Sequence, residues 1–217
     1  MGLTVCVGTP KDVEDVIRAR YASDFRLVNQ LLKAEGVAAH KERVPSRDWW
    51  TAEMSYGSLH FLRRFAAGIA VNGVPPEPLK RNASAAGAPE IRAYWEKRQA
   101  GEIGAQYDHL VFHSDAEGYY VPVDFPEVLN CDNAVPIPGE WLGSAIRLRQ
   151  ECADLATWLD LPQTVDFDPD DDDAWKQLKK KTRGAVWHKY PIEAFVCATL
   201  LLACDRSAEY RSAIVFG

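Results

Sequence analysis

The sequence predicts an α+β fold: a mainly helical single domain over residues 1–217, with a small antiparallel sheet that includes a central β-hairpin. Two observations lead to this prediction. Apolar residues recur at helical spacing in several long segments, whereas a central segment alternates as strands do. With 217 residues and 47% hydrophobic content, the chain is long enough to bury a core without disulfides or a metal.

Segments with the helical period are expected to form helices. The first ends near Gly36, a residue that readily adopts the left-handed conformation of a helix C-cap. The most apolar one contains a run, at residues 194–203, that is about half as long as a membrane span. The predicted helices cover residues 10–34, 58–70, 89–99, 140–159, 173–181 and 191–210.

Strands are expected at residues 3–7 and 212–216, close to the two ends of the chain. In the middle, residues 107–113 and 119–124 alternate between apolar and polar, and the turn-forming residues 114–118 join them, so we expect a β-hairpin. In that hairpin Leu110 and Phe112 would face the core.

Two segments are expected to be loops. Residues 72–88 are rich in Pro, Gly and Ala and predict a surface excursion. Residues 163–173 predict an acidic loop, because six of the eight residues from Asp166 to Asp173 are aspartate. A calcium-binding EF-hand loop starting at Asp166 would need glycine where Asp171 stands and glutamate where Gln177 stands, so that pattern fails. The aspartates instead fit a solvated loop and the start of a helix whose far end carries three lysines.

The net charge is −6, and it is unevenly distributed. Residues 101–217 contain 10 Lys and Arg against 20 Asp and Glu, whereas the first hundred residues carry a small positive excess. An acidic chain is a poor binder of the phosphate backbone, so we expect no binding to nucleic acid. The acidic half could attract a basic protein partner, or it could serve only to keep the protein soluble.

The five cysteines include no CxxC pair and are odd in number, which fits free thiols in a reducing compartment. The first eight residues contain no positive charge and only a short apolar run, so we expect no signal peptide. These features predict a soluble cytoplasmic protein that neither enters a membrane nor needs a cofactor.

The first candidate site is the loop at residues 113–119. At the tip of a hairpin, His113, Asp115 and Glu117 could turn inward and hold a hard or borderline metal ion, with Tyr119 beside them. His109 and His113 cannot share a metal on a strand, because they would stand about 13 Å apart. The alternative is a solvated turn in which the carboxylates face water and His113 binds a neighbouring backbone group.

The second candidate is His60, within an apolar predicted helix. It could act as a catalytic base, or it could be a core histidine whose hydrogen bonds are satisfied. Recognised nucleophile, phosphate-loop and dinucleotide motifs are absent from the sequence.

Three short pieces are similar to the YfbM-like group of small bacterial proteins of unknown function. They are Met1-Gly2 before a strand, the helix start Ser58-Leu59-His60-Phe61-Leu62, and the last ten residues before Gly217. The resemblance implies a bacterial α+β domain and no known activity.

These observations support two hypotheses about function. The first is a protein-binding module, similar in layout to the acidic immunity or accessory proteins that bacteria pair with toxins. The second is a metal-dependent, hydrolase-like enzyme with its site at residues 113–119. A pocket that gathers His113, Asp115 and Glu117 would favour the enzyme, and a flat acidic face would favour the binding module.

Overall fold

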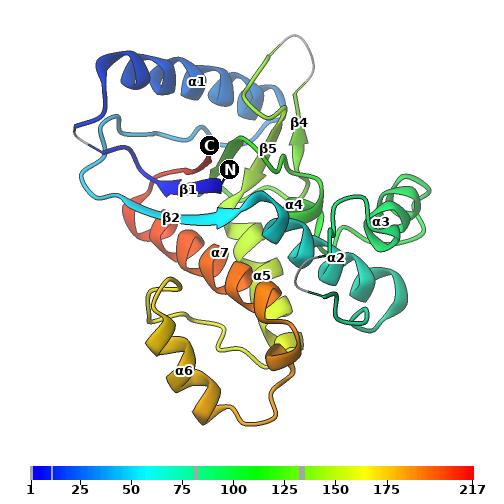
Figure 1. The fold of residues 1–217 in the computed structure, drawn as a ribbon. Coiled ribbons are helices and arrows are strands. Elements are labelled where there is room, and N and C mark those ends of the chain that lie inside the picture. Colours follow the sequence, from blue (N-terminus) through cyan, green and yellow to red (C-terminus); the bar gives the residue numbers. More distant parts are fainter. Residues whose placement is uncertain (1, 11, 81–82, 132–134) are drawn as a thin grey trace.

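A mixed β-sheet lies between helical layers in the computed structural model, which describes residues 2–10, 12–80, 83–131 and 135–217 (Figure 1). The strand order is β2-β1-β6-β3-β5-β4. Most neighbouring strands are antiparallel, but β3 and β5 run parallel. The strands are β1 (Gly2–Val7), β2 (Trp50–Ser55), β3 (Gly118–Val121), β4 (Leu129–Asn130), β5 (Trp141–Ser144) and β6 (Ile214–Phe216).

The helices cover both faces of this sheet, with α1 on one side and α5 and α7 on the other (Figure 1). The alternation of the strands explains how this works: Tyr119 of β3 belongs to the core beneath α1, and Tyr120 belongs to the opposite core. The helical elements are α1 (Asp15–Ala34), α2 (Tyr56–Asn72), α3 (Pro89–Gln99), α4 (Asp108–Val111), α5 (Ala145–Leu159), α6 (Asp172–Lys181), the 3-10 helix η1 (Val186–Lys189) and α7 (Pro191–Tyr210).

Local sequence signals set the ends of several helices. Ser55 caps α2 by accepting the N–H of Ser58, and Asp171 caps α6 by accepting the N–H groups of Asp173 and Ala174. Gly73 ends α2 in the left-handed conformation. Pro191 occupies the first turn of α7, where its missing N–H costs nothing.

The predicted fold class is confirmed, since helices dominate around a small sheet. The predicted hairpin is wrong. Residues 108–111 form the helical turn α4, and β3 pairs with β5 and β6 rather than with the preceding segment. The cause is tertiary: the Glu151 carboxylate on α5 accepts the backbone N–H groups of His109 (3.0 Å) and Leu110 (2.8 Å).

The alternation expected for the hairpin also fails, because His109, Leu110, Val111 and His113 are all buried. Parallel pairing of β3 with β5 further makes the sheet mixed instead of antiparallel. The predicted helix at 140–159 is likewise divided, since its first residues form β5 and the helix α5 begins at Ala145.

Both predicted loops lack helices and strands over most of their described residues. In the 72–88 segment, residues 81 and 82 lie outside the described ranges. The rest is tied to the helices: Arg64 donates to the Glu77 carbonyl (2.9 Å) and Tyr190 donates to the Pro76 carbonyl (2.9 Å). Among the described helices, none combines the length and apolar character needed to cross a membrane.

Candidate functional site

The buried His113 side chain contacts backbone carbonyls and an aromatic ring. Its two ring nitrogens each lie 3.1 Å from a backbone carbonyl, of Ser114 and of Tyr119, and its ring stacks on Tyr120 at a centroid distance of 3.9 Å. Burial lowers the pKa of His113 to about 4, which favours the neutral ring. The structure therefore places His113 in the core of the fold.

The other residues of the 113–119 loop point to three different elements. Asp115 pairs with His60 on α2 at 2.7 Å, and Glu117 lies 3.9 Å from Arg20 on α1. The Tyr119 hydroxyl donates to Asp24, also on α1, at 2.6 Å. Across residues 2–10, 12–80, 83–131 and 135–217, no three His, Cys, Asp or Glu side chains gather as a metal ion requires. His113, Asp115 and Glu117 thus do not converge.

His60 is partly buried and does find a carboxylate. Burial lowers its pKa first, the nearby Arg63 lowers it further, and Asp115 opposes both by favouring the charged ring. The contact joins α2 to a loop and becomes an ion pair only when the ring is protonated; 18% of the His60 side chain is exposed. The structure places His60 next to Asp115. Because the two residues are far apart in the sequence, this pairing could not be predicted from it.

Arg63 was not singled out from the sequence, yet it organises the same loop. It is 5% exposed, and its guanidinium donates to the carbonyls of Leu110 (2.8 Å), His113 (2.5 Å) and Ser114 (3.1 Å). A buried arginine satisfied by backbone carbonyls is a structural clamp. An arginine inside an apolar helical pattern was the only available signal.

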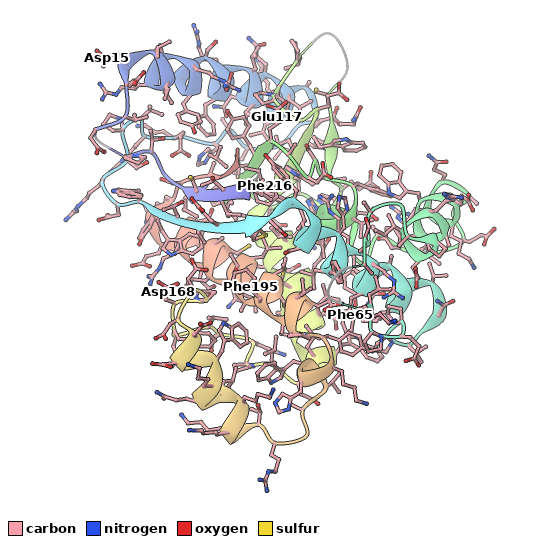
Figure 2. All side chains as sticks on the ribbon, in the orientation of Figure 1. Asp15, Phe65, Glu117, Asp168, Phe195 and Phe216 are labelled. Atoms are coloured by element: carbon pink, nitrogen blue, oxygen red, sulfur yellow. The ribbon has the colours of Figure 1, made fainter. Side chains whose placement is uncertain are left out.

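A dense group of charged residues lies elsewhere, in the segment that leads into α6. Its aspartates are all exposed, and we call these six residues the aspartate segment. Figure 2 shows one of them, Asp168, on the loop before α6, far from α1. The aspartate segment consists of Asp166, Asp168, Asp170, Asp171, Asp172 and Asp173.

The aspartate segment is structured. Asp168 accepts the Asp170 N–H (3.0 Å), and Asp171 caps α6. The Trp175 indole donates to the Pro169 carbonyl at 2.7 Å, and the Phe167 ring packs edge-on against Trp175. These contacts anchor the loop to the first turns of α6 while its carboxylates face solvent.

Negative charge is dense at this place. Partial desolvation raises the pKa of the exposed Asp170, and the neighbouring charges of Asp168 and Glu53 raise it further. Glu53 is an exposed residue of β2, so the acidic surface extends from the loop onto the edge of the sheet. Mutual repulsion of this kind costs stability, which makes the cluster a candidate for a functional surface.

Fold and surface together define a class: an α+β protein with six exposed carboxylates close together on a structured segment. A family model described as "Putative DNA-mimic protein" matches residues 1–216, and the chain therefore belongs to this family. The searches of curated proteins and of solved structures gave no match.

The family corrects two expectations. The hypotheses of a metal-dependent hydrolase and of an immunity or accessory module are wrong, because the family description points to imitation of DNA. The partner expectation is wrong as well. It gave nucleic-acid recognition no role, whereas a DNA mimic binds proteins that bind DNA. The broader expectation of protein binding fits the family. The resemblance to YfbM-like proteins stays a prediction, since no comparison addresses it.

Proposed function

We propose that this protein is a DNA mimic that occupies the DNA-binding surface of a DNA-binding protein, with the aspartate segment in the place of phosphates. The observation that carries the proposal is the row of six exposed aspartates held against α6. Surfaces that bind DNA present Lys and Arg to a dense row of negative charges, one per roughly 1.7 Å of duplex. Carboxylates on a structured loop offer those cations similar ligands.

Most carboxylates of the aspartate segment are not engaged in ion pairs with the described residues and can bind the cations of a partner. Asp173 pairs with Lys176 at 2.8 Å. For Asp166, Asp170 and Asp172, the described residues supply no ion pair. A cationic partner would therefore gain attraction at these positions without first breaking an existing pair.

Anchoring of the loop supports tight binding for a second reason. Ordering a flexible segment at an interface costs free energy, and a segment that is already ordered avoids part of that cost. The contacts of Trp175 with Pro169 and Phe167 hold the aspartates before any partner arrives.

The test is displacement of DNA. A fluorescent duplex is bound to each member of a panel of purified repressors and nucleoid proteins, and this protein is added as competitor. We expect displacement from at least one member, weakening as salt rises. The triple variant Asp166→Asn, Asp168→Asn, Asp170→Asn should displace the duplex at least about tenfold less well. Asparagine keeps a side-chain oxygen that can accept the turn hydrogen bond.

The matched control removes three exposed carboxylates elsewhere: Asp12→Asn, Glu35→Gln and Glu96→Gln. It changes the net charge equally and should displace DNA as wild type does. Equal loss in both variants would mean that net charge alone matters, and absence of displacement from every panel member would contradict mimicry. A gel shift of the duplex by this protein alone would also contradict it.

A further inference from the structure

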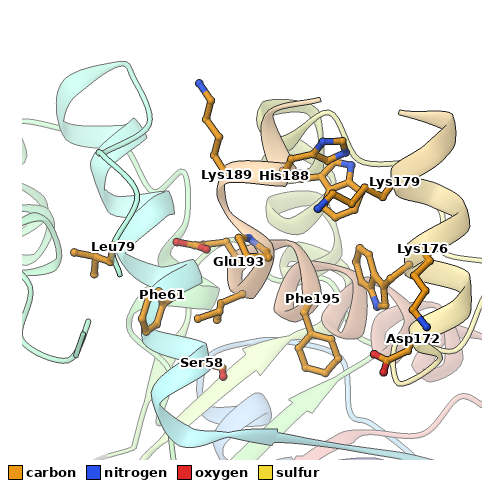
Figure 3. A pocket seen from close by; sticks show the side chains of 14 residues that line it. Ser58, Phe61, Leu79, Asp172, Lys176, Lys179, His188, Lys189, Glu193 and Phe195 are labelled. Atoms are coloured by element: carbon orange, nitrogen blue, oxygen red, sulfur yellow. The ribbon is translucent and has the colours of Figure 1, made fainter. Parts of the chain in front are cut away.

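A cavity of about 770 Å³ opens between α2, α6 and the start of α7, and the proposed DNA mimicry does not use it (Figure 3). This volume lies within the range of small-molecule sites. The cavity combines aromatic residues with lysines, an unusual composition for a surface of an acidic protein.

Aromatic rings form the apolar wall. Trp175 of α6 and Trp187 of η1 line it with their ring centroids 5.4 Å apart, and Phe61 and Phe195 complete it. Both indole N–H groups are already satisfied, by the Pro169 carbonyl (2.7 Å) and by the Thr182 hydroxyl (3.1 Å). The rings are therefore fixed in place and offer contact area without an unmet hydrogen bond.

Cations gather on one side of this wall. Lys176, Lys179 and His188 line the cavity and also an adjoining hollow of about 730 Å³, which Lys180 and Arg183 complete. In Figure 3, Lys179 extends from α6 toward His188, whereas Lys189 extends away from the cavity.

Few described carboxylates pair with these cations. Within the described ranges, Lys179, Lys180 and Arg183 take part in no ion pair, and Lys176 pairs only with Asp173. The acidic residues that line the cavity are Asp172 and Glu193. Glu193 is buried, and burial raises the pKa of its carboxyl, which favours the protonated form.

We propose that this cavity binds a small molecule that joins a flat aromatic ring to phosphate groups, the chemistry of a nucleotide. The ring would contact the wall of Trp175, Trp187 and Phe195, as planar rings do on aromatic side chains. The phosphates would lie against Lys176, Lys179, Lys180 and Arg183, because several clustered cations suit a polyanion better than a single carboxylate. The cavity adjoins the aspartate segment at Asp172, but the proposal does not depend on DNA mimicry.

Calorimetric titration of the full chain tests the proposal, with intrinsic tryptophan fluorescence as a second readout. The probes are adenosine, guanosine and uridine triphosphates, compared with adenosine and with inorganic tripolyphosphate. We expect at least one nucleotide to bind and to quench the fluorescence, while adenosine and tripolyphosphate each bind at least about tenfold more weakly.

The variants separate a site from general attraction. Lys179→Ala should weaken nucleotide binding about tenfold or more. Lys181→Ala removes the same charge from the same helix, but Lys181 lines neither hollow, and it should change affinity less than about twofold. Equal losses in both variants, binding of tripolyphosphate as tight as that of the nucleotide, or no binding of any nucleotide at millimolar concentration would overturn the proposal.

Discussion

His60 Nε2 lies 2.7 Å from Asp115 Oδ2, and this pair joins α2 to the loop that precedes β3. One turn further along α2, Arg63 binds the carbonyls of His113 and Ser114 in the same loop. The two contacts should contribute differently to stability, because the His60–Asp115 contact is partly exposed and Arg63 is buried. Substitutions can separate them.

Asp115→Asn should lower the pKa of His60 below its wild-type value, because the carboxylate is what favours the charged ring. With 43% of the Asp115 side chain exposed, the loss of stability should stay below about 1 kcal/mol. An NMR titration of the His60 ring measures the pKa. Glu117→Gln is the control, since Glu117 lies in the same loop but faces Arg20; an unchanged or raised His60 pKa in Asp115→Asn would contradict the pairing.

Arg63→Ala should destabilise the protein by at least about 2 kcal/mol, because buried carbonyls lose their donors. Urea denaturation gives the free energy of unfolding. Arg92→Ala, at an exposed position of α3, should stay within about 0.5 kcal/mol of wild type. Similar losses in both variants would show that Arg63 is no clamp.

Stability should fall as the pH drops from about 6.5 to about 4. Burial lowers the pKa of both His109 and His113 from 6.5 to about 4. In this window the unfolded chain binds protons that the folded one does not, so acid favours unfolding. For His109 the structure gives a reason: its Nδ1 accepts the Ser144 N–H at 3.0 Å and would lose that role when protonated.

Buried Glu151 acts in the opposite sense, because burial raises its pKa and the folded chain then holds a proton that the unfolded chain releases above pH 4.5. Burial also raises the pKa of Glu193 and lowers that of His60, so three histidines oppose two carboxyls and the net slope should be about 1.4 kcal/mol per pH unit. Urea midpoints measured at several pH values between 4 and 6.5 test this. Because the carboxyls partly cancel the histidines, the contradicting result is an NMR titration in which the His109 and His113 rings titrate near 6.5 in the folded protein.

Gly143→Ala should cost about 1–3 kcal/mol, because an added methyl group would overlap the Tyr120 ring on the neighbouring strand β3. The matched control is Gly57→Ala in the first turn of α2, where the nearest atom, Ser55 Oγ, is 3.9 Å from the added carbon. That change should leave stability equal or raise it by up to about 1 kcal/mol. Thermal unfolding compares the two, and a tolerated Gly143→Ala would mean that Tyr120 can move aside.

Local signals were sufficient for several helices, because their backbone hydrogen bonds lie within the element. The sequence by itself predicts α7 with its observed bounds, because Pro191 opens a long apolar run, and it predicts α3 and most of α2 and α6. Helical hydrogen bonds join residues four apart, so their pattern is written in a short window of sequence. The aspartate segment is visible for the same reason.

Tertiary structure decided what depends on residues far apart in the chain. β2 and β5 are short strands defined by their neighbours β1 and β3, and α4 replaces a predicted strand because Glu151 captures its N–H groups. The pairing of His60 with Asp115 joins residues that are 55 positions apart in the sequence. The cavity between α2, α6 and α7 exists only once three helices meet. Such contacts do not produce a periodic pattern in the sequence. Each residue type can contact many partners, and the packing of the folded chain determines which partner it has.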